Sequence, residues 1–427
     1  MTDCVQFLDT DVDSDVEKEE IIEGIHNTWF KTHDKTKPWW KVLVLNGTTV
    51  IFIAHHSIAD GLSGYAFHRT FLQALNSSSS TLAASELEGE ENQRVQTPRV
   101  DPSSLPSPID SFQEKMSWFH AIKDFLFWTL LRFFIPSKYL LFSDAIISPF
   151  LPTVKHPLPS SPKTRTKVSI LRVEGTTVKN CLTACKRHET SFTALLHTII
   201  QVTLAEEYPH AKLGFSRQAV SVRRLLRREE RIGRDVVTNA VSVYYHIDIL
   251  SSYRKALIQP TTTTARNFDA RGQAGAREEM LDKDLIWKLA RKYKQNLNKS
   301  IYTTKSVAQN FLVAKALGED NEDMGEFFGK GLYQYNSSLI SNLGAFEPCA
   351  ESADRVEGES LGWEVSGVAF SAGAIRAKLG DFGIVFNVAS AKDGDCVICG
   401  CWEEGVLREE MVKMVLRRVG EKIAMVG

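Results

Sequence analysis

Two apolar runs on either side of Asn46-Gly47 constrain the fold more than any other feature of this sequence. The runs are Val42–Leu45 and Val50–Ala54, and Asn-Gly between two apolar runs is the strongest short-range signal for a β-hairpin. The second run is apolar throughout, which is typical of a strand covered on both faces. It leads into HHSIADG, residues 55–61, and then into a helical pattern predicted to end near Asn76.

The rest of the chain alternates strand and helix patterns in the same way and predicts an α/β fold. An acidic N-terminal segment is followed by a helical pattern whose apolar residues include Ile21, Ile22 and Ile25. KVSILRVEG predicts a strand, and the next 33 residues predict two helices with a break near 188–190. IWKLARKYKQNLNKS predicts an amphipathic helix. GIVFNVAS and CVICGCW predict two strands joined through Asp393-Gly394, before a final helix.

Segments rich in serine, proline and charge divide the chain. Residues 77–111 predict a flexible insertion, residues 149–165 a linker or crossover, and residues 251–280 another mobile loop. We therefore expect an N-terminal lobe over 1–148 and a C-terminal lobe over 166–427.

Composition excludes several classes of protein. The 427 residues are 43% hydrophobic and 24% charged, as in ordinary globular proteins rather than disordered ones. The formal charge of −1 provides no global field to attract nucleic acid, so none is expected as a partner. Seven cysteines, and a first segment without a basic and then apolar leader, favour a reducing compartment, and we expect a cytoplasmic protein.

Residues 118–142 raise the question of a membrane, because most of them are apolar. Lys123, Asp124 and Arg132 interrupt the run and Pro136 ends it, so the pattern favours a buried or surface-docked helix over a membrane span. Peripheral contact of this segment with an intracellular membrane stays open as an alternative.

The residues best suited to catalysis are His55 and His56 at the end of the second apolar run. Adjacent strand residues point to opposite faces, so only one of the two histidines faces a given cavity. An unperturbed imidazole titrates near pH 6.5, which suits a general base at neutral pH. Asp60 would hydrogen-bond the loop backbone or an arginine, and Gly61 would permit a tight turn. The alternative is structural: the histidines end a strand and Asp60 caps a helix.

HHxxxDG between a strand and a helix resembles the acyltransferase superfamily of chloramphenicol acetyltransferase, the plant BAHD enzymes and peptide-synthetase condensation domains. Four more stretches are similar to its fungal alcohol acetyltransferase branch. They are PWWKVLVL, AVSVRRLL, SSLISNLGAFEP at 337–348 and DFGIVFNVAS at 381–390.

The resemblance implies a chloramphenicol-acetyltransferase-like pseudodimer of two α/β lobes with a tunnel between them. It implies that His56, supported by His55, deprotonates an alcohol or amine that then attacks acyl-CoA. Asp60 would be structural and orienting, with Arg223 as its candidate partner. Acyl-CoA would be a co-substrate, and no permanently bound cofactor or metal is expected. A monomer would complete the tunnel.

Further site residues follow from the same resemblance. Gly61 and Asn342 are candidates for substrate binding, although Asn342 fits a strand-to-turn role equally well. Asp381 and Gly383 resemble the start of the BAHD box, which in the family lies away from the reacting atoms and supports the tunnel, so they are expected to be structural. Ile384 stands where that box has a tryptophan, so the match is partial. Fewer residues precede His55 than in the family, which indicates a shortened first lobe. Two alternatives stay open: a condensation-type enzyme using a carrier-bound acyl group, and an inactive member acting as a binding protein.

Three remaining patterns favour structural roles. The arginines between 223 and 234 could meet CoA phosphates, but a solvated loop is the commoner explanation. Cys181, Cys185 and the three cysteines at 396, 399 and 401 are predicted to be buried thiols rather than zinc ligands. His197, on an apolar helix, is predicted to be a core histidine.

Overall fold

The computed structural model describes residues 4–10, 12, 14–28, 30, 36–85, 117–119, 122–123, 126–127, 130, 134–142, 165–225, 236–258, 280–302, 336–348, 362–373 and 382–427. Several predictions concern residues outside this set. They are the insertion beyond residue 85, the linker at 149–164, the loop at 259–279, the arginines beyond 225, and Asp381. The division into lobes at 149–165 thus stays a prediction.

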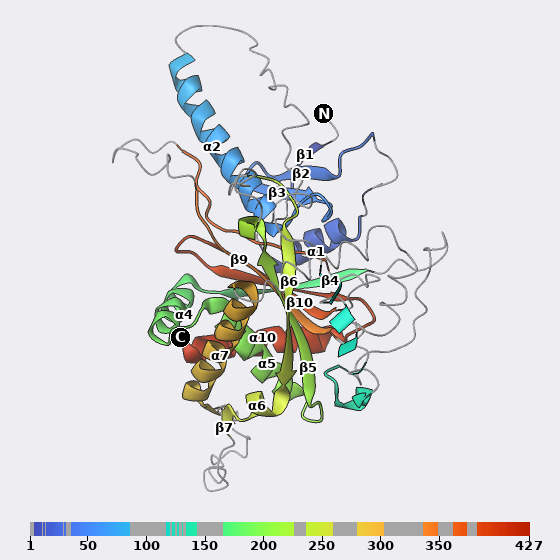
Figure 1. The fold of residues 1–427 in the computed structure, drawn as a ribbon. Helices are drawn as coiled ribbons and strands as arrows, with labels where there is room; N and C mark the ends of the chain where they lie inside the picture. The colour runs from blue at the N-terminus through green and yellow to red at the C-terminus, as the bar shows by residue number, and fades with distance from the viewer. Residues whose placement is uncertain are drawn as a thin grey trace, which may run out of the picture.

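A six-stranded mixed sheet forms the centre of the molecule, in the order β4-β11-β10-β9-β5-β6 (Figure 1). Strand β9 runs parallel to both β10 and β5, and the other neighbours are antiparallel. The strands are β4 (Thr166–Val173), β5 (Leu213–Ser221), β6 (Val241–Ile249), β9 (Asn336–Phe346), β10 (Phe382–Ala391) and β11 (Cys396–Glu403). The predicted strands and the turn at Asp393-Gly394 are confirmed, and the chain is of the α/β class.

Both faces of this sheet are covered. Strand β11 is buried at every position. Ile398 and Trp402 belong to the large core cluster, whereas Val397 and Cys399 pack on the opposite face with Ile22 of α1 (Asp15–His26). Successive residues of a strand point to opposite faces of the sheet. Because both faces are covered at β11, CVICGCW has no polar face.

The helices that cover the large core confirm the predicted pattern. They are α4 (Gly175–Arg187), α5 (Phe192–Glu207) and α10 (Glu409–Val426), with α7 (Lys283–Tyr302) packed on α5. Helix α5 is apolar around most of its circumference and is therefore the central buried helix. The short helix α6 (Leu250–Arg254) and the two-stranded pair β7 (Leu257–Ile258) and β8 (Met280–Leu281) complete this side. The prediction of a mobile loop from residue 251 is therefore wrong for residues 251–258, which include helix α6 and strand β7.

A three-stranded sheet carries the predicted hairpin. Strand β1 (Val5–Leu8) runs parallel to β2 (Trp40–Leu45), which pairs antiparallel with β3 (Thr49–Ala54). Asn46 and Gly47 have φ values of 44° and 67°, and two positive φ angles are what a two-residue type I′ turn requires. The expectation that β3 is covered on both faces is wrong, because β3 is an outer strand of this sheet and its apolar residues are only partly buried.

Helix α2 (Gly61–Ser85) is longer than predicted. It continues past Asn76 into the serine run, where the Ser77 hydroxyl donates to the Gln73 carbonyl at 2.9 Å. A serine that bonds back to the preceding turn satisfies its own polar group without leaving the helix. The first nine residues of the predicted flexible insertion, 77–85, are therefore helical, and α2 projects away from the central sheet (Figure 1).

Helix α1 lies along the outer strand β4 and binds it through polar side chains. Four helical residues rise about 6.0 Å and two strand residues about 6.6 Å, so side chains at every fourth helix position meet every second strand residue. None of the α1 residues is fully buried, so the three isoleucines of the predicted apolar face are only partly covered. The contacts are Asn27 with the Thr166 backbone, Glu23 with the Val168 N–H, Glu19 with the Ile170 N–H, and Asp15 with the Arg172 side chain.

The apolar segment at 118–142 divides into two parts. Trp118, Phe119 and Phe134 are exposed, whereas Leu141 and Phe142 are buried in the large core. In the part of the chain that the structure describes, no helix is both long and apolar enough to cross a membrane. Peripheral contact with a membrane stays a prediction.

Candidate active site

The two histidines of HHSIADG directly follow β3, as predicted, and α2 begins at Gly61. The backbone N–H of His55 donates to the Trp39 carbonyl at 2.8 Å, and its ring packs against Trp39 at a centroid distance of 5.5 Å. His56 is exposed. One imidazole therefore packs on the protein while the other remains accessible.

The ring of His56 is held by its own loop. Nδ1 lies 3.1 Å from the carbonyl oxygen of Ala59. A carbonyl can only accept, so Nδ1 carries a proton, and in the neutral ring Nε2 is the nitrogen with the lone pair. The Asn239 amide donates to the His56 carbonyl at 2.6 Å, which anchors the backbone of the same residue. This tautomer presents Nε2 as a base.

His55 has a different state. Its Nδ1 accepts from the Ser57 N–H at 3.2 Å and lies 2.7 Å from the Ser57 hydroxyl. Burial, and then the charge of His56, lower the pKa of His55 below its ordinary value. A neutral ring whose acceptor nitrogen is already engaged supports the loop and is poorly suited to act as a second base.

Asp60 combines the two roles considered for it. Its Oδ1 accepts from the Arg223 guanidinium at 2.7 Å, so the contact expected from the sequence is present. The same oxygen accepts from the backbone N–H of Ser63 at 2.9 Å, as a helix N-cap does. The side chains of Asp60 and Arg223 are only 4% and 10% exposed. The carboxylate therefore holds the loop from inside the protein.

A segment just before β6 completes this network, and sequence reasoning missed it. The Ala240 N–H donates to Asp60 Oδ2 at 3.1 Å. The Ser63 hydroxyl donates to the Thr238 carbonyl at 2.7 Å, and Arg223 also donates to that carbonyl at 3.2 Å. Ser63 and Thr238 are 175 residues apart, so no local pattern could have indicated the contact.

Gly61 is required for space rather than for a turn. It does not have a positive φ, and a Cβ at this position would lie 2.6 Å from Leu343 and 2.9 Å from the ring of Phe370. The tight-turn explanation is therefore wrong, because Gly61 has no positive φ. Close packing of α2 means instead that a side chain at this position would have to displace those of Leu343 and Phe370. Its role in substrate binding stays a prediction.

Asn342 lies beside an irregularity in the pairing of β9 with β10. Its Oδ1 accepts from the Gly344 N–H at 2.8 Å, and its amide donates to Thr193 Oγ1 at 3.0 Å. Gly344 has a φ of 76°, and its carbonyl accepts from the Tyr65 hydroxyl at 2.8 Å. These contacts are structural, but they lie within β9 rather than at a strand-to-turn boundary, and substrate binding by Asn342 stays a prediction.

Gly383 packs as a structural residue would. A Cβ there would lie 2.5 Å from the ring of Phe142 and 2.8 Å from the Ser337 carbonyl. Residue 383 must therefore lack a side chain for β10 to pack this closely against Phe142 and Ser337. Asp381, its predicted structural neighbour, lies outside the described residues.

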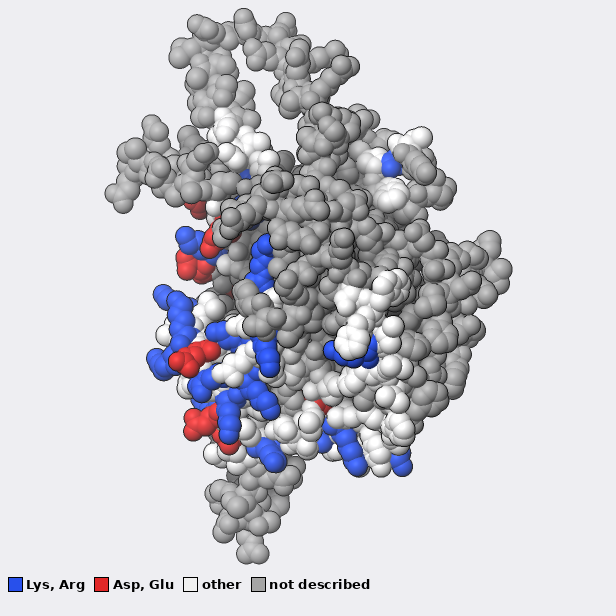
Figure 2. Space-filling view, viewed as in Figure 1, with Lys and Arg blue, Asp and Glu red and all other residues white. Residues whose placement is uncertain are grey.

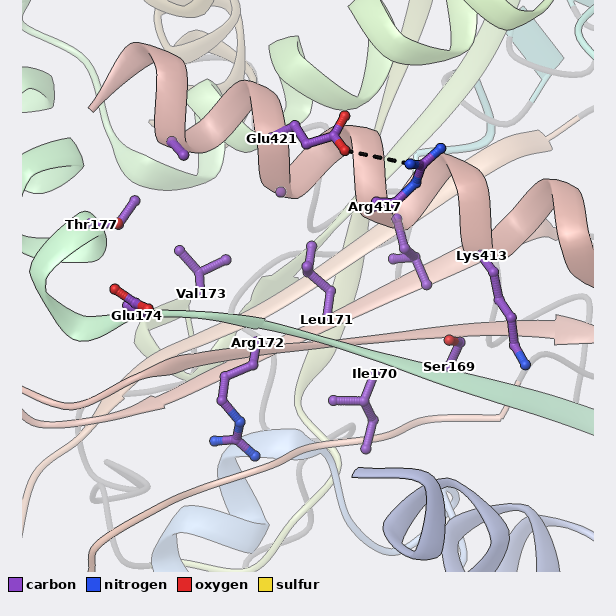
Figure 3. A pocket seen from close by; sticks show the side chains of 13 residues that line it. Ser169, Ile170, Leu171, Arg172, Val173, Glu174, Thr177, Lys413, Arg417 and Glu421 are labelled. Atoms are coloured by element: carbon purple, nitrogen blue, oxygen red, sulfur yellow. Dashed lines mark ion pairs between the residues drawn. The ribbon is translucent and has the colours of Figure 1, made fainter. Parts of the chain in front are cut away.

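The cavity in Figure 3 is at a different place, between β4, α4 and α10. It measures about 500 Å³, and Leu171 and Val173 point into it while Arg172 points to the other side of the strand (Figure 3). An ion pair of 3.8 Å between Arg417 and Glu421 borders it on α10. None of its lining residues belongs to HHSIADG, and the tunnel stays a prediction.

Positive charge is concentrated on one part of the surface. Figure 2 shows lysines and arginines gathered over α4 and α7. The exposed cations of these helices are Lys179, Lys186, Arg187, Lys283, Lys288, Lys292 and Lys299. The near-neutral total charge of the chain is thus unevenly distributed.

The predicted buried thiols are confirmed. Cys181, Cys185, Cys396, Cys399 and Cys401 are free and buried. Burial raises the pKa of Cys181 to about 11 and that of Cys396 to about 12. Such thiols are protonated at neutral pH and unreactive. His197 is fully buried, as predicted for a core histidine.

Known proteins resemble this chain in both sequence and fold. A probable alcohol acetyltransferase of Aspergillus fumigatus, crmB, is 24% identical over 95% of this chain and 77% of its own length. An uncharacterized protein of Schizosaccharomyces pombe is also 24% identical, over 85% of this chain and 68% of its own length.

Two solved structures show the fold. Trichothecene 15-O-acetyltransferase TRI3 from Fusarium sporotrichioides superimposes with a TM-score of 0.62 at 12% identity, over 99% of this chain and 76% of its own. The first condensation domain of the calcium-dependent antibiotic synthetase gives a TM-score of 0.53 at 9% identity, over 98% and 75%. The predicted fold class, that of the two-lobed condensation-like acyltransferases, is confirmed.

The family comparison extends over the motif and its surroundings. The alcohol acetyltransferase family matches residues 5–228, which include HHSIADG, its helix and Arg223. Because this match spans more than half of the chain, the protein belongs to the alcohol acetyltransferase family and is an acyltransferase.

Proposed function

We propose that this enzyme transfers an acetyl group from acetyl-CoA to the hydroxyl of a small-molecule alcohol, with His56 as the general base. The observation that carries the proposal is the bond from His56 Nδ1 to the Ala59 carbonyl. In the neutral ring this bond places the lone pair on Nε2 of an exposed side chain, which is what a base needs in order to reach a substrate hydroxyl.

The reaction needs one proton acceptor and no redox partner. Nε2 takes the proton of the acceptor hydroxyl as its oxygen attacks the thioester carbonyl carbon. The tetrahedral intermediate then breaks its C–S bond, and the CoA thiolate leaves with the proton returned by His56. The thioester supplies the driving force, and the protein supplies the base and its alignment.

Asp60 is a positioning residue in this proposal. Its carboxylate contacts Arg223, Ser63 and Ala240 rather than the imidazole. It fixes the loop whose Ala59 carbonyl selects the tautomer of His56, so its effect on the base is indirect.

Release of free thiol from acetyl-CoA, measured with a panel of alcohols and amines, tests the proposal. We expect alcohol-dependent release that falls by about 10²–10⁴-fold in His56→Ala, the usual contribution of a general base. The control is His210→Ala, which removes an exposed histidine outside the motif. Equal activity of both variants would contradict the role of His56, and release with amines alone would contradict the alcohol acceptor.

The donor distinguishes the rival functions. The same assay with the acetyl group on a phosphopantetheinyl carrier protein should be slower than with acetyl-CoA. Turnover with the carrier alone would favour a condensation-type enzyme. Acceptor binding by calorimetry without turnover from either donor would favour a non-catalytic binding protein.

A further inference from the structure

Two histidines and an aspartate meet inside the core. His197 lies on α5, and His246 and Asp248 lie on β6. One ligand atom from each residue lies within 4.8 Å of the other two. Asp248 Oδ1 is 3.3 Å from His197 Nε2 and 3.0 Å from His246 Nδ1.

The carboxylate in this cluster is unevenly satisfied. Its Oδ1 lies within reach of both histidines and also accepts from the Tyr253 hydroxyl at 3.0 Å. Its Oδ2 has no hydrogen-bond partner among the described residues, although the side chain is fully buried. An ionised oxygen left alone in the interior carries a large desolvation cost.

Two further buried oxygens nearby also lack a hydrogen-bond partner among the described residues. The hydroxyl of Tyr293, whose ring stacks on that of His197 at 3.7 Å, is buried without a partner among the described residues. So is Oε1 of Gln201, one turn after His197 on α5. A Cβ built at Gly214 would lie 3.5 Å from both Gln201 Oε1 and the Cβ of Asp248, so these side chains border the same space.

We propose that His197, His246 and Asp248 bind one Zn²⁺ ion. Imidazole nitrogens and carboxylate oxygens are ordinary zinc ligands, and bonds of about 2.0–2.2 Å at tetrahedral angles place two ligand atoms about 3.3 Å apart. The distances from Asp248 Oδ1 to His197 Nε2 and to His246 Nδ1, 3.3 and 3.0 Å, are close to this ligand-to-ligand distance. The three residues supply three of the four ligands of a tetrahedral ion, and water would complete the set.

This site is separate from the catalytic histidine. Asn239, which contacts His56, precedes β6, and His246 lies five residues beyond the first residue of that strand, or about 16 Å at 3.3 Å per residue. The ion would join the buried helix α5 to strand β6, so it is structural. Entry is at His246, whose side chain is 18% exposed.

Calorimetric titration of the chelator-treated full chain with Zn²⁺ tests the site. We expect one equivalent to bind and the melting temperature to rise until that equivalent is reached. His246→Asn, at the most exposed ligand, should weaken binding by about 10²-fold or more. His210→Asn, which removes an exposed histidine outside the cluster, should bind as the original chain does.

Co²⁺ provides a measurement that needs no variant. In the original chain it should give the visible absorption of a tetrahedral nitrogen and oxygen site, and Zn²⁺ should displace it. Failure of the folded original chain to bind Zn²⁺ would overturn the proposal and leave a hydrogen-bonded ion cluster. Equal weakening by His246→Asn and His210→Asn would overturn it too, since surface binding alone would then explain the titration.

Discussion

Two polar junctions attach the N-terminal elements to the central sheet, and they differ in how far water reaches them. In the junction at Asp60, the carboxylate and the Arg223 guanidinium are 4% and 10% exposed. In the junction between α1 and β4, the side chains of Arg172 and Asp15 are 37% and 35% exposed. Both junctions include an ion pair between an aspartate and an arginine, and the burial of that pair is the main difference between them.

This difference indicates what each junction does. A buried ion pair cannot lose one partner without leaving the other charge uncompensated. An exposed pair can exchange its partner for water at little cost. We therefore infer that the Asp60 junction fixes one position of the motif loop, whereas the α1 junction covers an outer strand that water could also solvate.

The largest effect is expected from Asp60→Ala. Removing the carboxylate leaves the buried Arg223 without its counter-ion, which typically costs about 3–5 kcal/mol of unfolding free energy. Urea unfolding measures the loss. The control is Glu410→Ala, at an exposed position of α10, which should change stability by less than about 0.5 kcal/mol. Similar losses in the two variants would remove the distinction between the junctions.

A steric change at the same junction should have the next largest effect. Gly61→Ala places a Cβ against Leu343 and Phe370, and overpacking of this kind costs about 1–3 kcal/mol. Gly64→Ala is the matched control, because a Cβ there meets nothing within 4 Å. In a helix it should stabilise the protein by up to about 1 kcal/mol. Thermal unfolding of the pair should give shifts of opposite sign.

A smaller loss is expected at the α1 junction. Glu19→Ala frees the Ile170 N–H, which lies on an outer strand where water can replace the carboxylate. The net cost should be about 1 kcal/mol. Glu19→Gln keeps an acceptor oxygen and should recover most of it. A loss of unfolding free energy as large as that of Asp60→Ala would show that water does not reach this junction either.

The smallest effect is expected on the dependence of stability on acidic pH. The hydrogen bond from Arg172 lowers the pKa of Asp15 below its usual value. A carboxyl with a depressed folded-state pKa stabilises the protein above its unfolded pKa, and this contribution is lost as pH falls through the folded pKa. Asp15→Asn should therefore reduce the acid dependence of stability below about pH 5, near the ordinary range of Asp titration. Unchanged pH profiles would contradict a folded-state bond in solution.

Local patterns predicted much of the fold and the position of the motif. The hairpin at Asn46-Gly47 depends on φ angles that these two residues tolerate best. The strand, HHSIADG and helix follow one another along the chain, so the sequence places them directly. The burial of β11 at every position also agrees with its continuous apolar run.

What could not be predicted depends on contacts between distant residues. The bond of Glu19 to Ile170 spans 151 residues, and that of Ala240 to Asp60 spans 180. The acidic N-terminal segment therefore gave no sign of its partner strand. His197, Gln201 and Asp248 likewise meet only when α5 packs on the sheet, so their unpartnered atoms were invisible in the sequence. The Asp60 pair was found only through the family resemblance.

The spacing of α1 against β4 also has a consequence for synthesis. Glu19 leaves the ribosome 151 residues before Ile170, a delay of roughly 8–30 s at common elongation rates of about 5–20 residues per second. During this time the acids of α1 have only solvent and early parts of the chain as neighbours. Strand β4 in turn joins β11, which is made later still. Helix α1 is therefore made long before the strand that it covers, and its contacts with β4 cannot form until that strand has been synthesised.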